Sequence, residues 1–189
     1  MRWAGAMRAM GAAVVAVGAA GCIGTIDRGD FDREIQERGG GFTSELPLAA
    51  VEAVADELGT QDVALRSLSV TPSSETVTME VRDPAVPANL DQYVVRGGEV
   101  DSVAPIRLSA TDDLDAETFP ASGLAFDRIE PMVDAALAEF DPGTGYVTSL
   151  IATQRGAGEA VFLLGLESPR ASATATFSAA GELLEVTRS

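Results

Sequence analysis

The sequence predicts an α+β fold made of a duplicated unit, in which one helix packs on an antiparallel sheet of about four strands. Two segments, 63–103 and 146–186, have the same length and align without a gap. Apolar and polar residues alternate within both, which is typical of strands that bury one face. An amphipathic helical pattern precedes each segment. With 46% hydrophobic residues, the chain can bury a core.

The first expected helix begins near Ser44 and ends before Gly59. Ser44 belongs to a residue type that caps helices, Pro47 falls in the tolerant first turn, and Gly59 can close the last turn. We expect this helix to cover the strands of a first α+β repeat over 44–109. Its apolar face consists of Val51, Val54, Ala55 and Leu58.

The second expected helix lies in a second α+β repeat over 124–189. Asp127 and Glu130 have the spacing of a capping box, and Pro131 again falls in the first turn. Residues 110–123 are then an acidic linker between the repeats. The apolar face of this helix consists of Ile129, Met132, Val133, Ala136, Leu137 and Phe140.

Two glycines mark the expected hairpins of the strand regions. Gly98 and Gly181 occupy equivalent positions, each between two apolar runs, as hairpin turns do. The phrases around them are YVVRGGEVDSV at 93–103 and ATFSAAGELLEV at 175–186. These phrases resemble the PepSY group of extracytoplasmic bacterial domains, and the tandem arrangement is similar to the β-lactamase inhibitory protein architecture. The resemblance covers about 43–109 and 124–189 and implies binding or regulation, not catalysis.

The N-terminus has the pattern of a lipoprotein signal peptide over residues 1–21. Arg2 and Arg8 precede an uncharged run of small apolar residues, which is too short to span a bilayer as a helix. The residues Ala-Ala-Gly before Cys22 resemble the lipobox of bacterial lipoproteins, which implies lipidation of Cys22 and cleavage just before it. An ordinary signal peptide with a chance cysteine is the alternative. We expect a flexible tether over 22–43 and a location at the outer, extracytoplasmic face of the cell membrane.

Charge and composition exclude several function classes. The net charge of −16 argues against nucleic-acid binding and against docking on anionic lipid, so the membrane would be a partner only through lipidated Cys22. The chain has no histidine, and all 13 basic residues are arginine. A Ser-His-Asp site, an imidazole metal site and a lysine Schiff base are therefore impossible. We expect no catalytic residue, no cofactor and no metal ligand.

One acidic run calls for comparison with a calcium loop. Asp113, Asp115 and Glu117 alternate as the first ligands of such a loop do. Thr118 stands where the loop needs glycine, and Leu124 stands where it needs glutamate, so we favour a solvated linker. The function we expect is that of a lipid-anchored, non-catalytic binding or regulatory module with an extracytoplasmic protein partner. Alternatives are a carrier of lipid or another hydrophobic ligand and, less favoured, an extracytoplasmic hydrolase.

Overall fold

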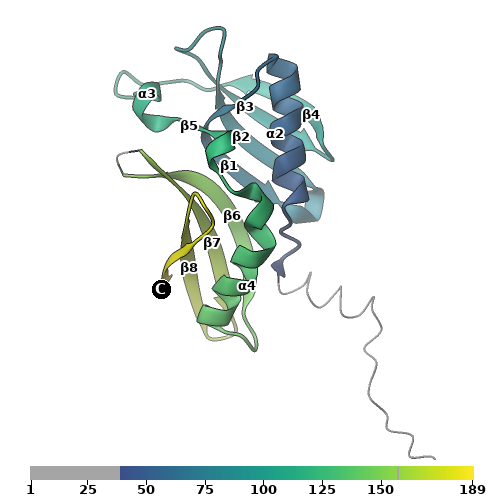
Figure 1. Ribbon diagram of the computed structural model, residues 1–189, viewed down its shortest axis with the longest axis vertical. Coiled ribbons are helices and arrows are strands. Elements are labelled where there is room, and N and C mark those ends of the chain that lie inside the picture. Colours follow the sequence, from purple (N-terminus) through teal and green to yellow (C-terminus); the bar gives the residue numbers. More distant parts are fainter. Residues whose placement is uncertain (1–38, 157) are drawn as a thin grey trace, which may run out of the picture.

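The computed structural model describes residues 39–156 and 158–189 (Figure 1). The predicted signal peptide, Cys22 and most of the predicted tether lie outside the described residues. The described residues form two long helices and a large antiparallel sheet, and both helices lie on the same side of that sheet. The long helices are α2 (Glu45–Leu58) and α4 (Ile129–Phe140).

The strands are β1 (Ala64–Thr71), β2 (Thr76–Arg82), β3 (Leu90–Arg96), β4 (Glu99–Pro105), β5 (Phe119–Pro120), β6 (Tyr146–Arg155), β7 (Glu159–Ser168), β8 (Ala171–Ser178) and β9 (Leu183–Arg188). Four short helical segments connect them, namely η1 (Pro72–Ser74), α3 (Leu114–Glu117), η2 (Ala121–Gly123) and η3 (Phe126–Arg128).

The predicted fold class is wrong, because the strands form a single nine-stranded sheet and not the separate sheets of a duplicated unit. The strand order is β4-β3-β2-β1-β6-β7-β8-β9, and β5 pairs with β1. The joint is the pairing of β1 with β6, where Leu68 lies opposite Ala152 and Val70 lies opposite Leu150. Two separate sheets would leave two more strand edges with unpaired backbone groups, and this joint removes both of them.

One hydrophobic core lies between the helices and the sheet. Residues from both helices and from all the long strands except β4 and β9 are buried in it. The rings of Phe126 and Phe162 meet edge to face at 5.5 Å, where the segment before α4 reaches β7. Phe42, which the sequence assigns to the tether, is also buried there, so the core extends from residue 42.

The ends of the two helices agree only in part with expectation. Gly59 closes α2 with a left-handed φ of 62°, as predicted. Ser44 precedes α2, but its hydroxyl does not cap that helix and instead accepts a hydrogen bond from the Ile129 amide of α4 at 3.3 Å. The capping box of α4 is likewise wrong, because the side chain of Asp127 caps nothing and that of Glu130 accepts hydrogen bonds from Ser44.

The segment expected to be an acidic linker, 110–123, is part of the folded structure. Phe119 of β5 lies opposite Leu65 of β1 and is buried. Ala121 is buried too, and its amide donates to the Val63 carbonyl at 2.8 Å. This segment therefore passes along the sheet and holds α3 against it.

Candidate binding face

The sheet has one face under the helices and one face turned away from them, which we call the open face. The strand registers place side chains of four strands in one row across it. In this row Thr78 of β2 lies opposite Ser69 of β1, Ser69 opposite Ile151 of β6, and Ile151 opposite Leu163 of β7. We call these four residues the uncharged row.

A second row runs beside the first and is uncharged on β1 and β6, whereas Glu80 of β2 lies opposite Ser67 in it. Ser67 of β1 lies opposite Thr153 of β6. Their neighbours along each strand, Leu68 and Ala152, are fully buried toward the helices. The alternation along both strands therefore gives an apolar face to the core and a hydroxyl-rich face to the open side.

An ion pair borders the uncharged row on the β1–β2 side. The β1–β2 register shifts between Leu65 and Ser67, and this bulge places Arg66 beside Glu80. The Arg66 Nε donates to Glu80 Oε2 at 2.8 Å, and both side chains are about one quarter exposed. This hydrogen bond raises the pKa of Arg66, so its guanidinium stays charged across the physiological range.

A second ion pair borders the row on the far side. The Arg155 guanidinium of β6 contacts the Glu185 carboxylate of β9 at 2.8 Å. In a flat sheet β6 and β9 would lie about 14 Å apart, so the contact shows that the sheet curls toward its open face here. Val161 and Thr176, which face away from the helices in this part, are almost fully buried as a result. The β7–β9 end of the open face is therefore concave and bridged by the ion pair.

The carboxylates of the acidic run that was compared with a calcium loop have partners within the protein. Asp113 caps α3 through its side chain, which accepts from the amides of Asp115 and Ala116. The Asp115 carboxylate contacts Arg82 at 2.7 Å, and Glu117 lies 3.9 Å from Arg66. Within residues 39–156 and 158–189, no cluster of carboxylates or thiols has the arrangement of a metal site.

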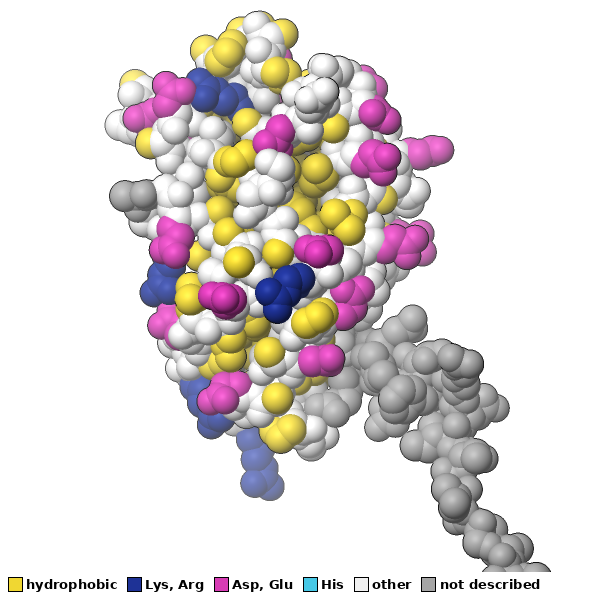
Figure 2. All heavy atoms as spheres, in the orientation of Figure 1, with side chains coloured by type: hydrophobic (Ala, Val, Ile, Leu, Met, Phe, Trp, Pro, Cys, Tyr) yellow, Lys and Arg dark blue, Asp and Glu magenta, His cyan; other side chains and the backbone are white. Residues whose placement is uncertain are grey.

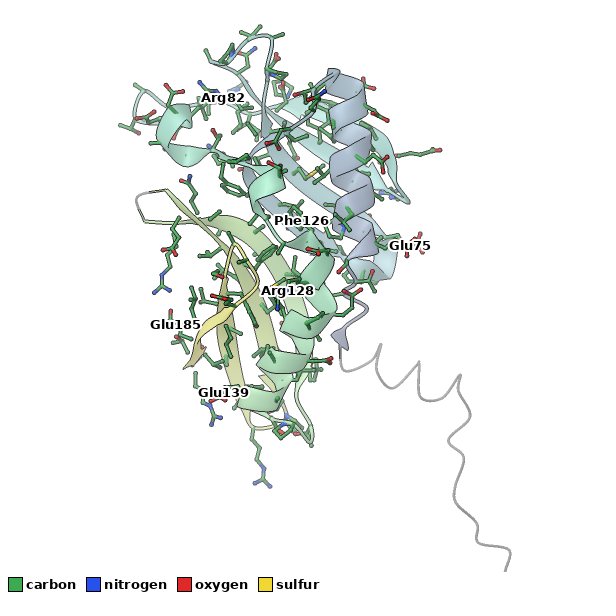
Figure 3. The ribbon with its side chains drawn as sticks, in the orientation of Figure 1. Glu75, Arg82, Phe126, Arg128, Glu139 and Glu185 are labelled. Atoms are coloured by element: carbon green, nitrogen blue, oxygen red, sulfur yellow. The ribbon has the colours of Figure 1, made fainter. Side chains whose placement is uncertain are left out.

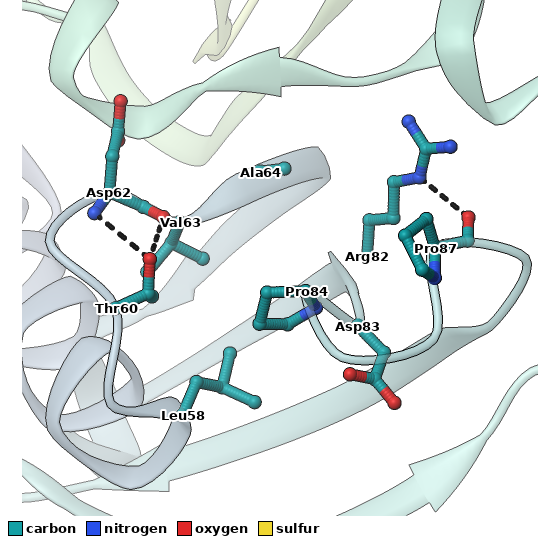
Figure 4. Close-up of a pocket in the computed structure, with 9 residues that line it drawn as sticks. All are labelled: Leu58, Thr60, Asp62, Val63, Ala64, Arg82, Asp83, Pro84 and Pro87. Atoms are coloured by element: carbon teal, nitrogen blue, oxygen red, sulfur yellow. Dashed lines mark hydrogen bonds between the residues drawn. The ribbon is translucent and has the colours of Figure 1, made fainter.

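A small cavity lies between the end of α2 and the β2–β3 loop (Figure 4). Its volume is about 200 Å³, and its polar side chains already have partners. Arg82 Nε donates to the Pro87 carbonyl at 2.6 Å, and both carboxylate oxygens of Asp62 accept from Ser122. Thr60 Oγ1 donates to the Asp62 carbonyl at 2.9 Å. These bonds make the cavity a structural feature of the loop junction, not a site with free reactive groups.

The surface that the helices present is different from the open face. Figure 2 shows this side with acidic side chains at many positions and few arginines. Glu52 and Asp56 of α2 and Asp134 and Glu139 of α4 are exposed here. The helix side therefore carries exposed carboxylates, whereas the uncharged row of the open face carries none.

The arginines that border the open face are the residues that sequence reasoning missed. Arg66 and Arg155 lie at positions where apolar–polar alternation predicts only an outward side chain, and the acids they meet come from other strands.

The predicted lipidation site Cys22 lies outside the described part of the chain. No protein-family model matches this sequence, and no curated protein or solved structure is significantly similar to it. No helix in the described part of the chain is long and apolar enough to cross a bilayer.

Proposed function

We propose that the protein is a non-catalytic binding module, displayed at the outer face of the cell membrane by a lipid on Cys22, and that its open face binds a protein partner. The uncharged row carries this proposal. The centres of protein–protein interfaces are depleted of charged residues, and this row is uncharged in a chain with a net charge of −16. Ile151 at its middle is 36% exposed, which offers an apolar contact.

The dimensions of the row fit a protein surface. Four neighbouring strands at a spacing of about 4.8 Å give a width of about 14 Å before the rim is counted. The ion pairs on either side, Arg66–Glu80 and Arg155–Glu185, resemble the polar rim that surrounds an interface centre. The predicted resemblance to PepSY domains favours the same class of function.

The alternative, a carrier of a hydrophobic ligand between helix and sheet, has less support. A carrier of this kind needs an apolar cavity of several hundred Å³ at that place. Here the space between α2, α4 and the sheet is filled by buried side chains, among them Met79, Met132 and Phe162. The filled core therefore favours a module that binds at its surface.

The test is photo-crosslinking in intact cells from matched positions. A crosslinking amino acid replaces Thr78 on the open face or, as the control, Asp134 on the exposed side of α4. We expect one or a few discrete partners to be captured from position 78 and not from position 134. Equal capture from both positions, or recovery of bound lipid with no protein, would contradict the proposal.

The anchor has a test of its own. We expect mass spectrometry of the mature protein to find an acylated N-terminal Cys22, and Cys22→Ser to release the protein from membranes. An unmodified Cys22, or membrane association unchanged by Cys22→Ser, would remove the anchor while leaving the binding face to be judged by crosslinking.

A further inference from the structure

A groove opens where strands β1 and β6 part. They pair from Ser67 and Thr153 to Val70 and Leu150, and beyond this point β1 ends while β6 runs on to Tyr146. In the described chain, the stretch 146–149 of β6 pairs with β7 alone. No described strand pairs with the other side of this stretch, where Gly40 lies against the Val147 carbonyl oxygen. Residues 40–42 and 69–73 form the walls of the groove.

The end of the groove next to β6 is free of charge. It is a hollow of about 390 Å³ lined by hydroxyl and apolar groups. None of the described residues that line this hollow is charged, so it favours small neutral side chains. The lining residues are Gly40, Phe42, Ser69, Val70, Thr71, Pro72, Ser73, Val147, Thr148, Ser149, Leu150 and Ile151.

The other end of the groove is acidic. A hollow of about 650 Å³ adjoins the first one and shares Gly40, Pro72 and Ser73 with it. Glu45 from the start of α2 and Glu75 from the β1–β2 turn line this second hollow, and both are exposed. Figure 3 places Glu75 beside the N-terminal part of α2. No arginine lines either hollow, so this end has a net negative potential.

We infer that this groove binds an extended polypeptide segment that carries an arginine or lysine next to small uncharged residues. Gly40 covers the Val147 carbonyl, so the segment is recognised through the two adjoining hollows, which receive its side chains. The four residues of β6 along the groove span about 13 Å, which is the length of a short peptide strand. Glu45 and Glu75 provide the charge complementarity to the basic residue. The groove adjoins the open face of the proposed function and shares Ser69 and Ile151 with the uncharged row, whereas Glu45 and Glu75 lie outside that row.

The experiment is titration of the ¹⁵N-labelled chain from residue 22 onward, with Cys22→Ser, by three seven-residue peptides. Each peptide has acetylated and amidated ends and alternates threonine and valine before a final arginine, glutamine or glutamate. We expect the arginine peptide to shift the amide signals of Thr71, Ser73, Ser149 and Gly98. The glutamine peptide should bind about threefold more weakly, and the glutamate peptide should cause no shift.

Two variants and a matched control locate the site. Ser73→Trp fills the groove at an exposed position that lines both hollows, and it should weaken the arginine peptide at least about tenfold. Glu75→Gln should reduce the preference for arginine over glutamine, because Glu45 remains as the only described carboxylate that lines the groove. Ser172→Trp, at an exposed serine of β8 outside the groove, should bind as the parent does.

Three results would overturn the inference. These are no shift with the arginine peptide at millimolar concentration, shifts confined to strands β4 or β9, and unchanged binding by both Ser73→Trp and Glu75→Gln.

Discussion

At the scale of single residues, Ser44 and Glu130 link the starts of the two long helices. The Ser44 amide donates to Glu130 Oε1 at 2.9 Å, and its hydroxyl donates to Glu130 Oε2. The same hydroxyl accepts from the Ile129 amide, one of the donors that the start of α4 leaves unpaired. Burial alone would raise the pKa of Glu130, but the hydrogen bonds from Ser44 outweigh it, and the pKa lies below its usual value.

This link predicts a pH-dependent contribution to stability. A carboxyl whose pKa is lowered by folding stabilises the protein above its unfolded pKa, and that contribution is lost as the pH falls through the folded value. We expect Glu130→Gln to lower the free energy of unfolding by about 1 kcal/mol at pH 7, because the site is partly exposed. Urea unfolding at pH 7 and pH 3 checks this. The difference between parent and variant should shrink at the lower pH, and Glu139→Gln on the same helix should show neither effect.

Alanine substitutions at Gly40 and Gly59 distinguish two costs of adding a Cβ, namely the strain of a left-handed backbone and a collision with a neighbouring atom. Their φ angles are nearly equal, at 64° and 62°. A Cβ at Gly59 would have open space, whereas one at Gly40 would collide with the Val147 carbonyl oxygen. We expect Gly59→Ala to cost about 1 kcal/mol from the left-handed backbone alone. Gly40→Ala should cost at least about 1 kcal/mol more in urea unfolding, and equal costs would show that the 39–42 segment does not pack against β6.

At the scale of elements, α3 is held by its cap, its buried Leu114 and the two arginines of the sheet. A four-residue helix cannot be stable by itself, because the first turn is costly to form. We expect Asp113→Ala, which removes the cap, to cost about 1 kcal/mol and to speed amide exchange at residues 115–118. Asp112→Ala, the preceding acid, is the control for charge. If the amides of residues 115–118 exchange at the same rate in both variants, the cap does not stabilise α3.

Elements were predictable from the sequence wherever their signals are local. Pro47 and Gly59 delimit α2 through backbone preferences that act within one turn, and Gly98 and Gly181 fall in hairpin turns as expected. The predicted side-chain caps at the starts of α2 and α4 were wrong because Ser44 is bonded to Glu130, a residue that is distant in sequence. The ion pairs of the open face could not be predicted for the same reason, since Arg155 and Glu185 meet only once the sheet has curled.

At the scale of the whole molecule, the joint between β1 and β6 decides the architecture. The apolar alternation of β1 is the same for an edge strand and for a central strand, so the sequence pattern does not reveal the partner of Leu68 or Val70. In the fold both residues are buried beside β6 as well as beneath the helices. A continuous sheet also makes the open face of β2, β1, β6 and β7 a single surface, which neither half offers alone.

We expect the protein to unfold as one cooperative unit. The two tyrosines report on different sides of the joint, because Tyr93 lies on β3 and Tyr146 on β6. The single tryptophan, Trp3, lies within the predicted signal peptide, so the chain from residue 22 onward has only tyrosine emission. Tyr146→Phe leaves Tyr93 as the reporter, and Tyr93→Phe leaves Tyr146. We expect each urea transition to coincide with the far-ultraviolet circular dichroism of the same variant.

Leu68→Ala then tests whether the joint carries this cooperativity. Leu68 is fully buried at the joint, and its truncation should cost about 2–5 kcal/mol. If the sheet unfolds as one unit, the variant moves the transitions seen by Tyr93 and by Tyr146 to the same lower midpoint. A Leu164→Ala variant, fully buried on β7 and away from the joint, should also move both transitions together. A shift of Tyr93 alone in Leu68→Ala, or of Tyr146 alone in Leu164→Ala, would show that the two sides of the sheet fold independently.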